Sequence, residues 1–128
     1  MESLSKKIKD VVQGIESHLA ASPNSPNFIS LKNLEDFCNH QLFQSDNAEE
    51  QFFCFYISHL LGSFFSNFGG DTPFDSDIHT ARINFYIFMS KKLDLLSESI
   101  ITNKDDSIKI LSDMTHHYIS TINYLNKS

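Results

Sequence analysis

The chain has 128 residues, of which 41% are hydrophobic and 20% carry a charge. This length suits one domain with its own core, and the composition excludes an extensively disordered chain. The net charge is −6, and Arg82 is the sole arginine. Nucleic acids bind basic surfaces and phosphate groups favour arginine, so we expect residues 1–128 to form a single domain that recognises no nucleic acid.

Two amphipathic helices are predicted in the first third of the chain. Over residues 4–21, apolar residues recur at helical spacing at Leu4, Ile8, Val11, Val12, Ile15 and Leu19. Pro23 and Pro26 end this helix, because proline lacks the amide hydrogen that a helix needs. The second helix is predicted over residues 31–43, with Ser30 as its N-terminal cap.

A third helix is predicted over residues 47–67, the most apolar part of the chain. Apolar side chains cover most of its circumference: Phe52, Phe53, Phe55, Tyr56, Ile57, Leu60, Leu61, Phe64 and Phe65. Such a helix is typical of the centre of a bundle. The alternative is a buried strand over residues 52–57, since aromatic residues favour strands. Asp46 and Glu49 resemble a capping box at the start of the helix.

The clearest helix start in the sequence is at Thr72, Pro73 and Asp75. They supply a capping hydroxyl, a proline at the first helical position and an acid in the first turn. The predicted fourth helix runs from there to about residue 101, and the fifth runs from Asn103 to about residue 125. Helices joined by short connections predict an all-α fold, a single-domain antiparallel bundle of about five helices around the Phe-rich third helix.

Histidine and aspartate are the residues most relevant to catalysis or metal binding. Three aspartates precede a histidine by four residues, at Asp36/His40, Asp75/His79 and Asp113/His117. This spacing places both side chains on one helical face, where they would form surface ion pairs. The sequence contains no Glu-x-x-His motif of di-metal bundles and no Gly-x-Ser-x-Gly motif of hydrolases. We therefore expect no enzymatic activity, no catalytic residue, no metal and no cofactor.

The sequence offers two indications of cellular location. Cys38 and Cys54 lie in apolar helical segments, which predicts buried free thiols in a reducing compartment. The first residues do not resemble a secretory signal, and the longest apolar run, residues 52–65, is shorter than the roughly 20 residues that span a bilayer. We therefore expect a cytoplasmic protein with no membrane attachment.

Acidic residues are concentrated in the middle of the chain. Residues 33–81 contain eight Asp or Glu and no Lys or Arg, a segregation that attracts basic partners. The predicted partner-binding site combines six acids with three phenylalanines: Asp46, Glu49, Glu50, Asp71, Asp75 and Asp77, with Phe43, Phe68 and Phe74. These residues would converge if the starts of the third and fourth helices are neighbours.

We interpret these features as those of a non-catalytic acidic protein-binding module. Its expected form is an immunity protein or antitoxin that masks a basic toxin such as a nuclease, with fast association driven by opposite charges. The alternative is a helical regulatory protein that senses a ligand or metal in a pocket between the third helix and its neighbours. A homodimer is an assembly that the sequence also allows.

Overall fold

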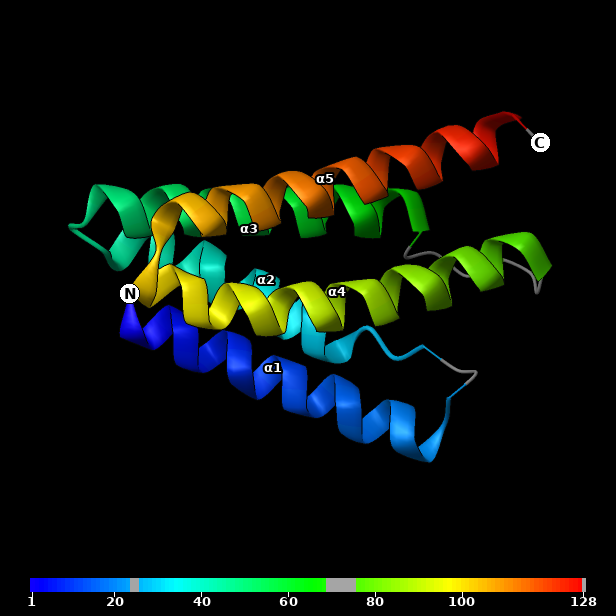
Figure 1. Cartoon of the computed structure of the whole chain (residues 1–128), viewed down its shortest axis with the longest axis horizontal. Helices are drawn as coiled ribbons and strands as arrows, with labels where there is room; N and C mark the ends of the chain where they lie inside the picture. The colour runs from blue at the N-terminus through cyan, green and yellow to red at the C-terminus, as the bar shows by residue number, and fades with distance from the viewer. Residues whose placement is uncertain (24–25, 69–75, 128) are drawn as a thin grey trace.

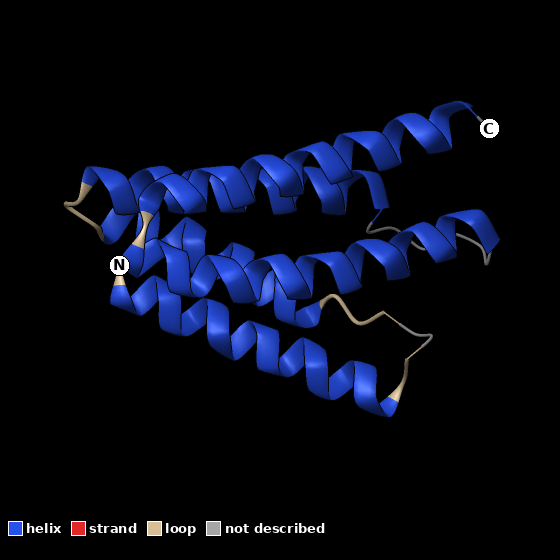
Figure 2. Ribbon diagram, in the orientation of Figure 1, coloured by secondary structure: helices blue, strands red, loops and turns tan. Residues whose placement is uncertain are grey.

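The computed structural model describes residues 1–23, 26–68 and 76–127 of the chain, without the side chains of residues 68, 76 and 125–127. It contains five helices (Figure 2): α1 (Glu2–Ala21), α2 (Ile29–Gln44), α3 (Ala48–Phe68), α4 (Ser76–Thr102) and α5 (Lys104–Lys127). The part of the chain described here has no strand, so the predicted all-α fold is confirmed. The alternative strand over residues 52–57 is wrong, because these residues lie inside α3.

The helices form an antiparallel bundle whose order in space differs from the order in sequence. The closest backbone packing joins α2 with α3, α1 with α2, α1 with α4, and α4 with α5. The row of neighbours is therefore α3–α2–α1–α4–α5, with α3 and α5 at its ends. The row curves until α5 runs alongside α3 in the same direction (Figure 1). Hydrogen bonds from Tyr56 to Thr115 and from Asn67 to Tyr118 join these two helices.

The connections determine which helix ends meet. The α2–α3 and α4–α5 turns lie at the same end of the bundle as the N-terminus (Figure 1). The starts of α1, α3 and α5 are therefore gathered there, together with the ends of α2 and α4. The start of α4 lies at the opposite end.

The core is built from the apolar stripes that helical spacing predicts. In α1, the buried residues include Leu4, Ile8, Val11, Val12 and Ile15. In α4, the fully buried apolar side chains are Phe85, Tyr86, Met89, Leu93, Leu96 and Ile100. Across the core, the ring of Phe64 stacks on that of Phe85, with 4.0 Å between the ring centroids. Burial of each large apolar side chain stabilises the fold by about 1.5–3 kcal/mol, so these stripes hold the helices together.

Helix α3 has two apolar faces, of which one is in the core. Phe53, Cys54, Ile57, Leu60, Leu61 and Phe64 are buried. By contrast, Phe52 is 48% exposed and Phe55 is 58% exposed. Helix α3 therefore packs into the core along one face. With α2 as its one close helical neighbour, it lies at the end of the row of described helices and not at the predicted centre of the bundle.

The structure corrects two predicted helix starts. The cap of α3 is Asn47, whose Oδ1 accepts a hydrogen bond of 2.9 Å from the amide of Glu50, so the predicted capping box of Asp46 is wrong. Helix α2 begins at Ile29, before the predicted cap Ser30, and the Ile29 amide donates to Asn27 Oδ1. At the start of α5, Asn103 Oδ1 accepts from the amide of Asp106, as expected of a cap. The predicted cap at Thr72 lies outside the described residues.

Candidate functional site

Among the residues that the structure describes, the acids of the predicted partner-binding site do not converge. Asp46, Glu49 and Glu50 lie at the start of α3, whereas Asp77 lies in the first turn of α4. These starts are at opposite ends of the bundle (Figure 1), because α3 must run its full length of about 30 Å before the chain reaches α4. Asp71, Asp75 and Phe74 lie outside the described residues, as does the side chain of Phe68.

The Glu50 carboxylate forms an ion pair and a hydrogen bond with other groups of the same chain. Its side chain is buried, with 6% of the residue exposed, and the amino group of Met1 lies 3.1 Å from Oε2. Gln41 Nε2 donates a hydrogen bond of 3.0 Å to Oε1. Hydrogen bonds from Gln41 and Ser45, together with the Met1 amino group, lower the pKa of Glu50. Glu50 therefore holds the N-terminus against α2 and α3.

Glu49 lies beside Glu50 but remains accessible to solvent. It forms an ion pair with Lys104, which links the start of α3 to the start of α5. Both side chains are about half exposed, and exposed pairs of this kind contribute about 0–1 kcal/mol. The pair does not bury Glu49, so its carboxylate can still contact a partner.

An acidic surface lies at the end of the bundle where the N-terminus and both short turns meet. We call residues 1–5, 41–50 and 98–107 the acidic end. These segments contain seven acids and one lysine: Glu2, Asp46, Glu49, Glu50, Glu98, Asp105, Asp106 and Lys104. The rest of the chain has nine acids and nine Lys or Arg, so the net charge of −6 equals that of the acidic end.

Five carboxylates of the acidic end face solvent. Glu2, Asp46, Glu98, Asp105 and Asp106 are exposed and take part in none of the ion pairs found among the residues described. Phe43 lies at the end of α2, three residues before Asp46, and is 83% exposed. The acidic end therefore presents negative charge beside two large exposed apolar side chains, since Ile101 is also 50% exposed.

Helix direction explains why these acids gather. Glu2, Glu49, Asp105 and Asp106 lie in the first turns of α1, α3 and α5, where the helix dipole stabilises negative charge. In an up-and-down bundle the first turns of alternate helices meet at one end. Glu2, Glu98, Asp105 and Asp106 lie outside the acidic block of residues 33–81 and so were not predicted, although this alternation of helix direction identifies three of them, Glu2, Asp105 and Asp106.

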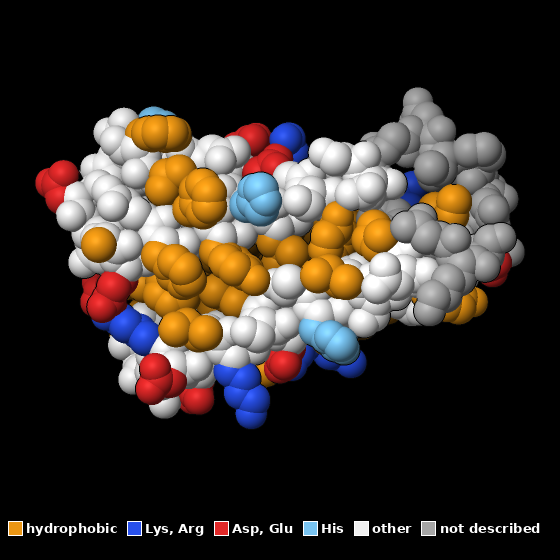
Figure 3. All heavy atoms as spheres, turned by 90° about the horizontal axis from the view of Figure 1, so that it is seen from above, with side chains coloured by type: hydrophobic (Ala, Val, Ile, Leu, Met, Phe, Trp, Pro, Cys, Tyr) orange, Lys and Arg blue, Asp and Glu red, His pale blue; other side chains and the backbone are white. Residues whose placement is uncertain are grey.

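The second surface feature is an apolar groove between α3 and α5. It has a volume of about 290 Å³ and is lined by Phe55, Tyr56, His59, Leu60, Ser63, Thr115, Tyr118 and Ile119. Phe52 and Ile108 lie one to two turns before these residues on the same helix faces and extend the apolar surface toward the acidic end. Seen from above (Figure 3), apolar side chains form a band along this part of the molecule. We call this surface the α3–α5 groove.

The third surface feature is a depression of about 780 Å³ between α2 and α3. Glu35 is buried at its wall and forms an ion pair with Lys32. Gly62 leaves room for this carboxylate, since a Cβ atom there would lie 2.8 Å from Glu35 Oε2. Because Lys32 neutralises Glu35, this depression has no unbalanced charge at that point.

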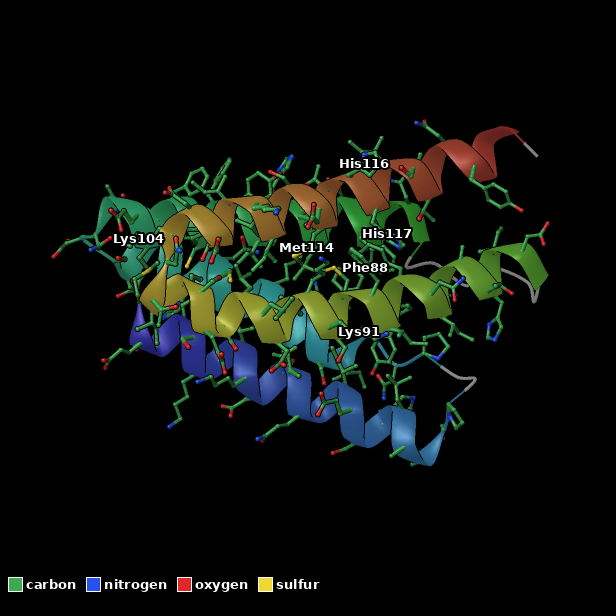
Figure 4. All side chains as sticks on the ribbon, viewed as in Figure 1. Phe88, Lys91, Lys104, Met114, His116 and His117 are labelled. Atoms are coloured by element: carbon green, nitrogen blue, oxygen red, sulfur yellow. The ribbon has the colours of Figure 1, made fainter. Side chains whose placement is uncertain are left out.

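The predicted Asp/His pairs are not formed where the structure describes both residues. Asp36 lies 3.9 Å from Lys32, and Asp113 lies 3.2 Å from Lys92. His117 instead stacks on Phe88 between α4 and α5, with ring centroids 4.0 Å apart (Figure 4). Burial lowers the pKa of His117, and the charge of the neighbouring His116 lowers it further.

The described residues contain no group of three or more His, Cys, Asp or Glu with the geometry to hold a metal ion. Cys38 in α2 and Cys54 in α3 are buried free thiols, as predicted. A hydrogen bond between the two thiols raises the pKa of Cys38 and lowers that of Cys54, although burial opposes the change at Cys54.

Comparison with known proteins gives no relative: no family model, no curated protein and no solved structure matches the chain. Within the described residues, no helix combines the length and the apolar character that are needed to cross a membrane.

Proposed function

We propose that this chain is a non-catalytic protein-binding module that docks a basic protein on its acidic end. The observation that supports this proposal most is the position of the charge. The acidic end has a side-chain charge of −6, from seven acids and one lysine, while the rest of the chain is balanced. A localised charge of this size attracts an oppositely charged protein and orients it before contact.

The chemistry of the acidic end also suits a protein partner. Exposed carboxylates can accept hydrogen bonds from the lysine and arginine side chains of that partner. Phe43, which is 83% exposed, supplies an aromatic anchor of the kind that dominates the energy of many protein interfaces. A basic toxin, such as a nuclease that an immunity protein or antitoxin masks, would meet both requirements.

Helix dipoles alone do not account for the whole acidic end. They stabilise the acids in the first turns of α1, α3 and α5. Glu98, by contrast, lies near the C-terminus of α4, where a helix dipole disfavours negative charge. This exposed acid therefore has no stabilising role that the dipoles explain, which favours a role in binding.

The proposal is tested with a charge-reversed variant, Asp46→Lys/Glu98→Lys/Asp105→Lys. Wild-type protein immobilised as bait, in a lysate of the organism that encodes the chain, should retain a basic protein at low salt and less of it at high salt. With that protein purified, the variant should associate at least about tenfold more slowly, because electrostatic steering is lost.

The matched control is Asp10→Lys/Glu16→Lys/Asp94→Lys, which makes the same change of charge at exposed positions outside the acidic end. It should associate much faster than the acidic-end variant, because the local field at the docking surface is retained. Equal association rates for wild type and both variants would overturn the proposal and favour the ligand-sensing alternative.

A further inference from the structure

We propose that the α3–α5 groove is the interface of a two-fold homodimer. The inference concerns a different surface from the acidic end and does not depend on the identity of a basic partner. It rests on the order of the helices, on the exposed apolar side chains and on the distribution of charge.

The order of the helices leaves this side of the bundle the least tightly packed. Helices α1, α2 and α4 each pack closely against two neighbours, whereas α3 and α5 lie at the ends of the row. Side chains such as Tyr56 and Thr115 bridge the two helices. A second copy packed on this side would give α3 and α5 the neighbours that the bundle does not supply.

The exposed apolar side chains on this side are large. Phe52 and Phe55 are 48% and 58% exposed, and Ile108 and Ile119 are each 49% exposed. The face of two adjacent helices of this length is about 30 Å long and about 20 Å wide, or roughly 600 Å². Two such faces would together bury about 1,200 Å², which is the lower end of the range for specific, stable interfaces. The face is therefore large enough for a dimer.

The distribution of charge favours a second copy as the occupant. The residues that line the groove include no Asp, Glu, Lys or Arg, so a basic partner would find no opposite charge there. Helices α3 and α5 are parallel, and a two-fold axis that crosses the groove at right angles to them makes the two copies antiparallel. The acidic ends then lie at opposite extremes of the dimer, farther apart than the screening length of about 8–10 Å.

This geometry forms an antiparallel four-helix bundle from α3 and α5 of each copy. Bundles of this kind pack through apolar side chains at a crossing angle of about 20°. With the axis near the middle of the groove, Phe52 of one copy lies toward the end of the groove that holds Ile119 of the other. Each copy thus contributes the same residues, as an isologous interface requires.

The experiment measures molar mass by light scattering during size-exclusion chromatography. Wild-type protein should have twice the mass of the 14.7 kDa chain. The variant Phe52→Gln/Ile119→Gln should have the mass of one chain, because it removes apolar area from both sides of the groove. Circular dichroism should show that it keeps its helical content, and Phe55→Gln/Ile108→Gln replaces it if it does not fold.

The matched control is Ile29→Gln/Leu95→Gln, which changes two apolar residues of α2 and α4 that are 65% and 55% exposed. It should remain a dimer. A wild-type protein with the mass of one chain would overturn the proposal. A helix of another protein would then be the alternative occupant of the groove. A dimer that persists in both groove variants would place the interface on another surface and would also overturn it.

The two proposals fail in different ways. The groove variant should be a monomer that still binds a basic partner, and the variant Asp46→Lys/Glu98→Lys/Asp105→Lys should be a dimer that binds it poorly. Loss of dimerisation in the charge-reversed variant would contradict the placement of the interface in the groove.

Discussion

The acidic end and the α3–α5 groove differ in how the chain builds them. The acidic end is assembled from the ends of all five helices, and its charges lie where helix dipoles and short turns bring them together. The groove is built along the sides of two helices and contains no charged lining residue. Charge is therefore concentrated at an end of the bundle, and exposed apolar surface along its side.

This separation matters for binding. Charged surfaces act at a distance and set the rate at which a partner arrives, whereas apolar surfaces act on contact and slow its release. Because the two surfaces are on different parts of the bundle, one copy can use both at the same time. The difference between the two surfaces can be tested by measuring how substitutions in each change the stability of the fold, as well as by measuring binding.

The largest expected effect is the difference in unfolding free energy between substitutions on the two apolar faces of α3. Phe64 is fully buried and stacks on Phe85, so Phe64→Ala should lower the free energy of unfolding by about 3–5 kcal/mol. Phe55→Ala, on the groove side, should lower it by less than about 1 kcal/mol. Urea denaturation followed by circular dichroism, in the Phe52→Gln/Ile119→Gln background, measures both in the isolated protomer. Equal losses would mean that the groove face is part of the core.

The next largest effect is the difference in unfolding free energy between substitutions of two adjacent carboxylates of the acidic end. Glu50→Gln should lower the free energy of unfolding by about 1–3 kcal/mol, because it removes a charge that buried hydrogen bonds and the Met1 amino group stabilise. Glu49→Gln should change it by less than about 1 kcal/mol, since its pair with Lys104 is exposed. Thermal and urea denaturation of both variants provide the comparison. A larger loss for Glu49→Gln would contradict the structural role assigned to Glu50.

A smaller effect tests which residue caps α3. Asn47→Ala should lower the free energy of unfolding by about 1 kcal/mol, because the amide of Glu50 loses its acceptor. Asp46→Ala should change it by no more than about 0.5 kcal/mol. Urea denaturation distinguishes the two variants. A larger loss of stability in Asp46→Ala than in Asn47→Ala would support the capping box that the sequence predicts.

The smallest effect is a difference in pH dependence between His117, in the middle of α5, and Glu50 at the acidic end. The lowered pKa of His117 makes the folded protein bind a proton less readily than the unfolded chain, so stability should fall as the pH drops below the ordinary value of 6.5. The lowered pKa of Glu50 makes its contribution present above the ordinary value of 4.5 and lost as the pH falls through its folded pKa.

Urea denaturation between about pH 8 and pH 3 measures these two changes. His117→Gln should remove the decline that begins near neutral pH and leave the decline at acidic pH, whereas Glu50→Gln should do the opposite. If His117→Gln leaves the decline near neutral pH unchanged, His117 is not its source.

Much of the fold follows from the sequence because helical spacing reports which side chains face a core. The stripe of Leu4, Ile8 and Ile15 predicts the buried face of α1, and Asn103 marks the start of α5. Spacing could not decide between the two apolar faces of α3. Both satisfy the same period, and the burial of one depends on where the other helices pack.

The candidate site was less predictable because nearness in sequence differs from nearness in space. The acids of residues 33–81 look like one block, but α3 separates Asp46 and Glu49 from Asp77 by the length of the bundle. Asp105 and Asp106 lie far from Asp46 in sequence and share its end of the bundle. The ion pairs of Glu49 and Glu50 depend on Lys104 and the Met1 amino group, which no local pattern connects to them.

The most direct test of the separation between the two surfaces is the dissociation constant of the dimer at low and high salt. Sedimentation equilibrium of the wild-type protein at about 0.05 M and about 0.5 M salt measures it across a large change in screening. An apolar interface with the acidic ends far apart predicts a change of less than about threefold. A change of about tenfold or more would mean that the acidic ends lie at the interface, which would contradict the account.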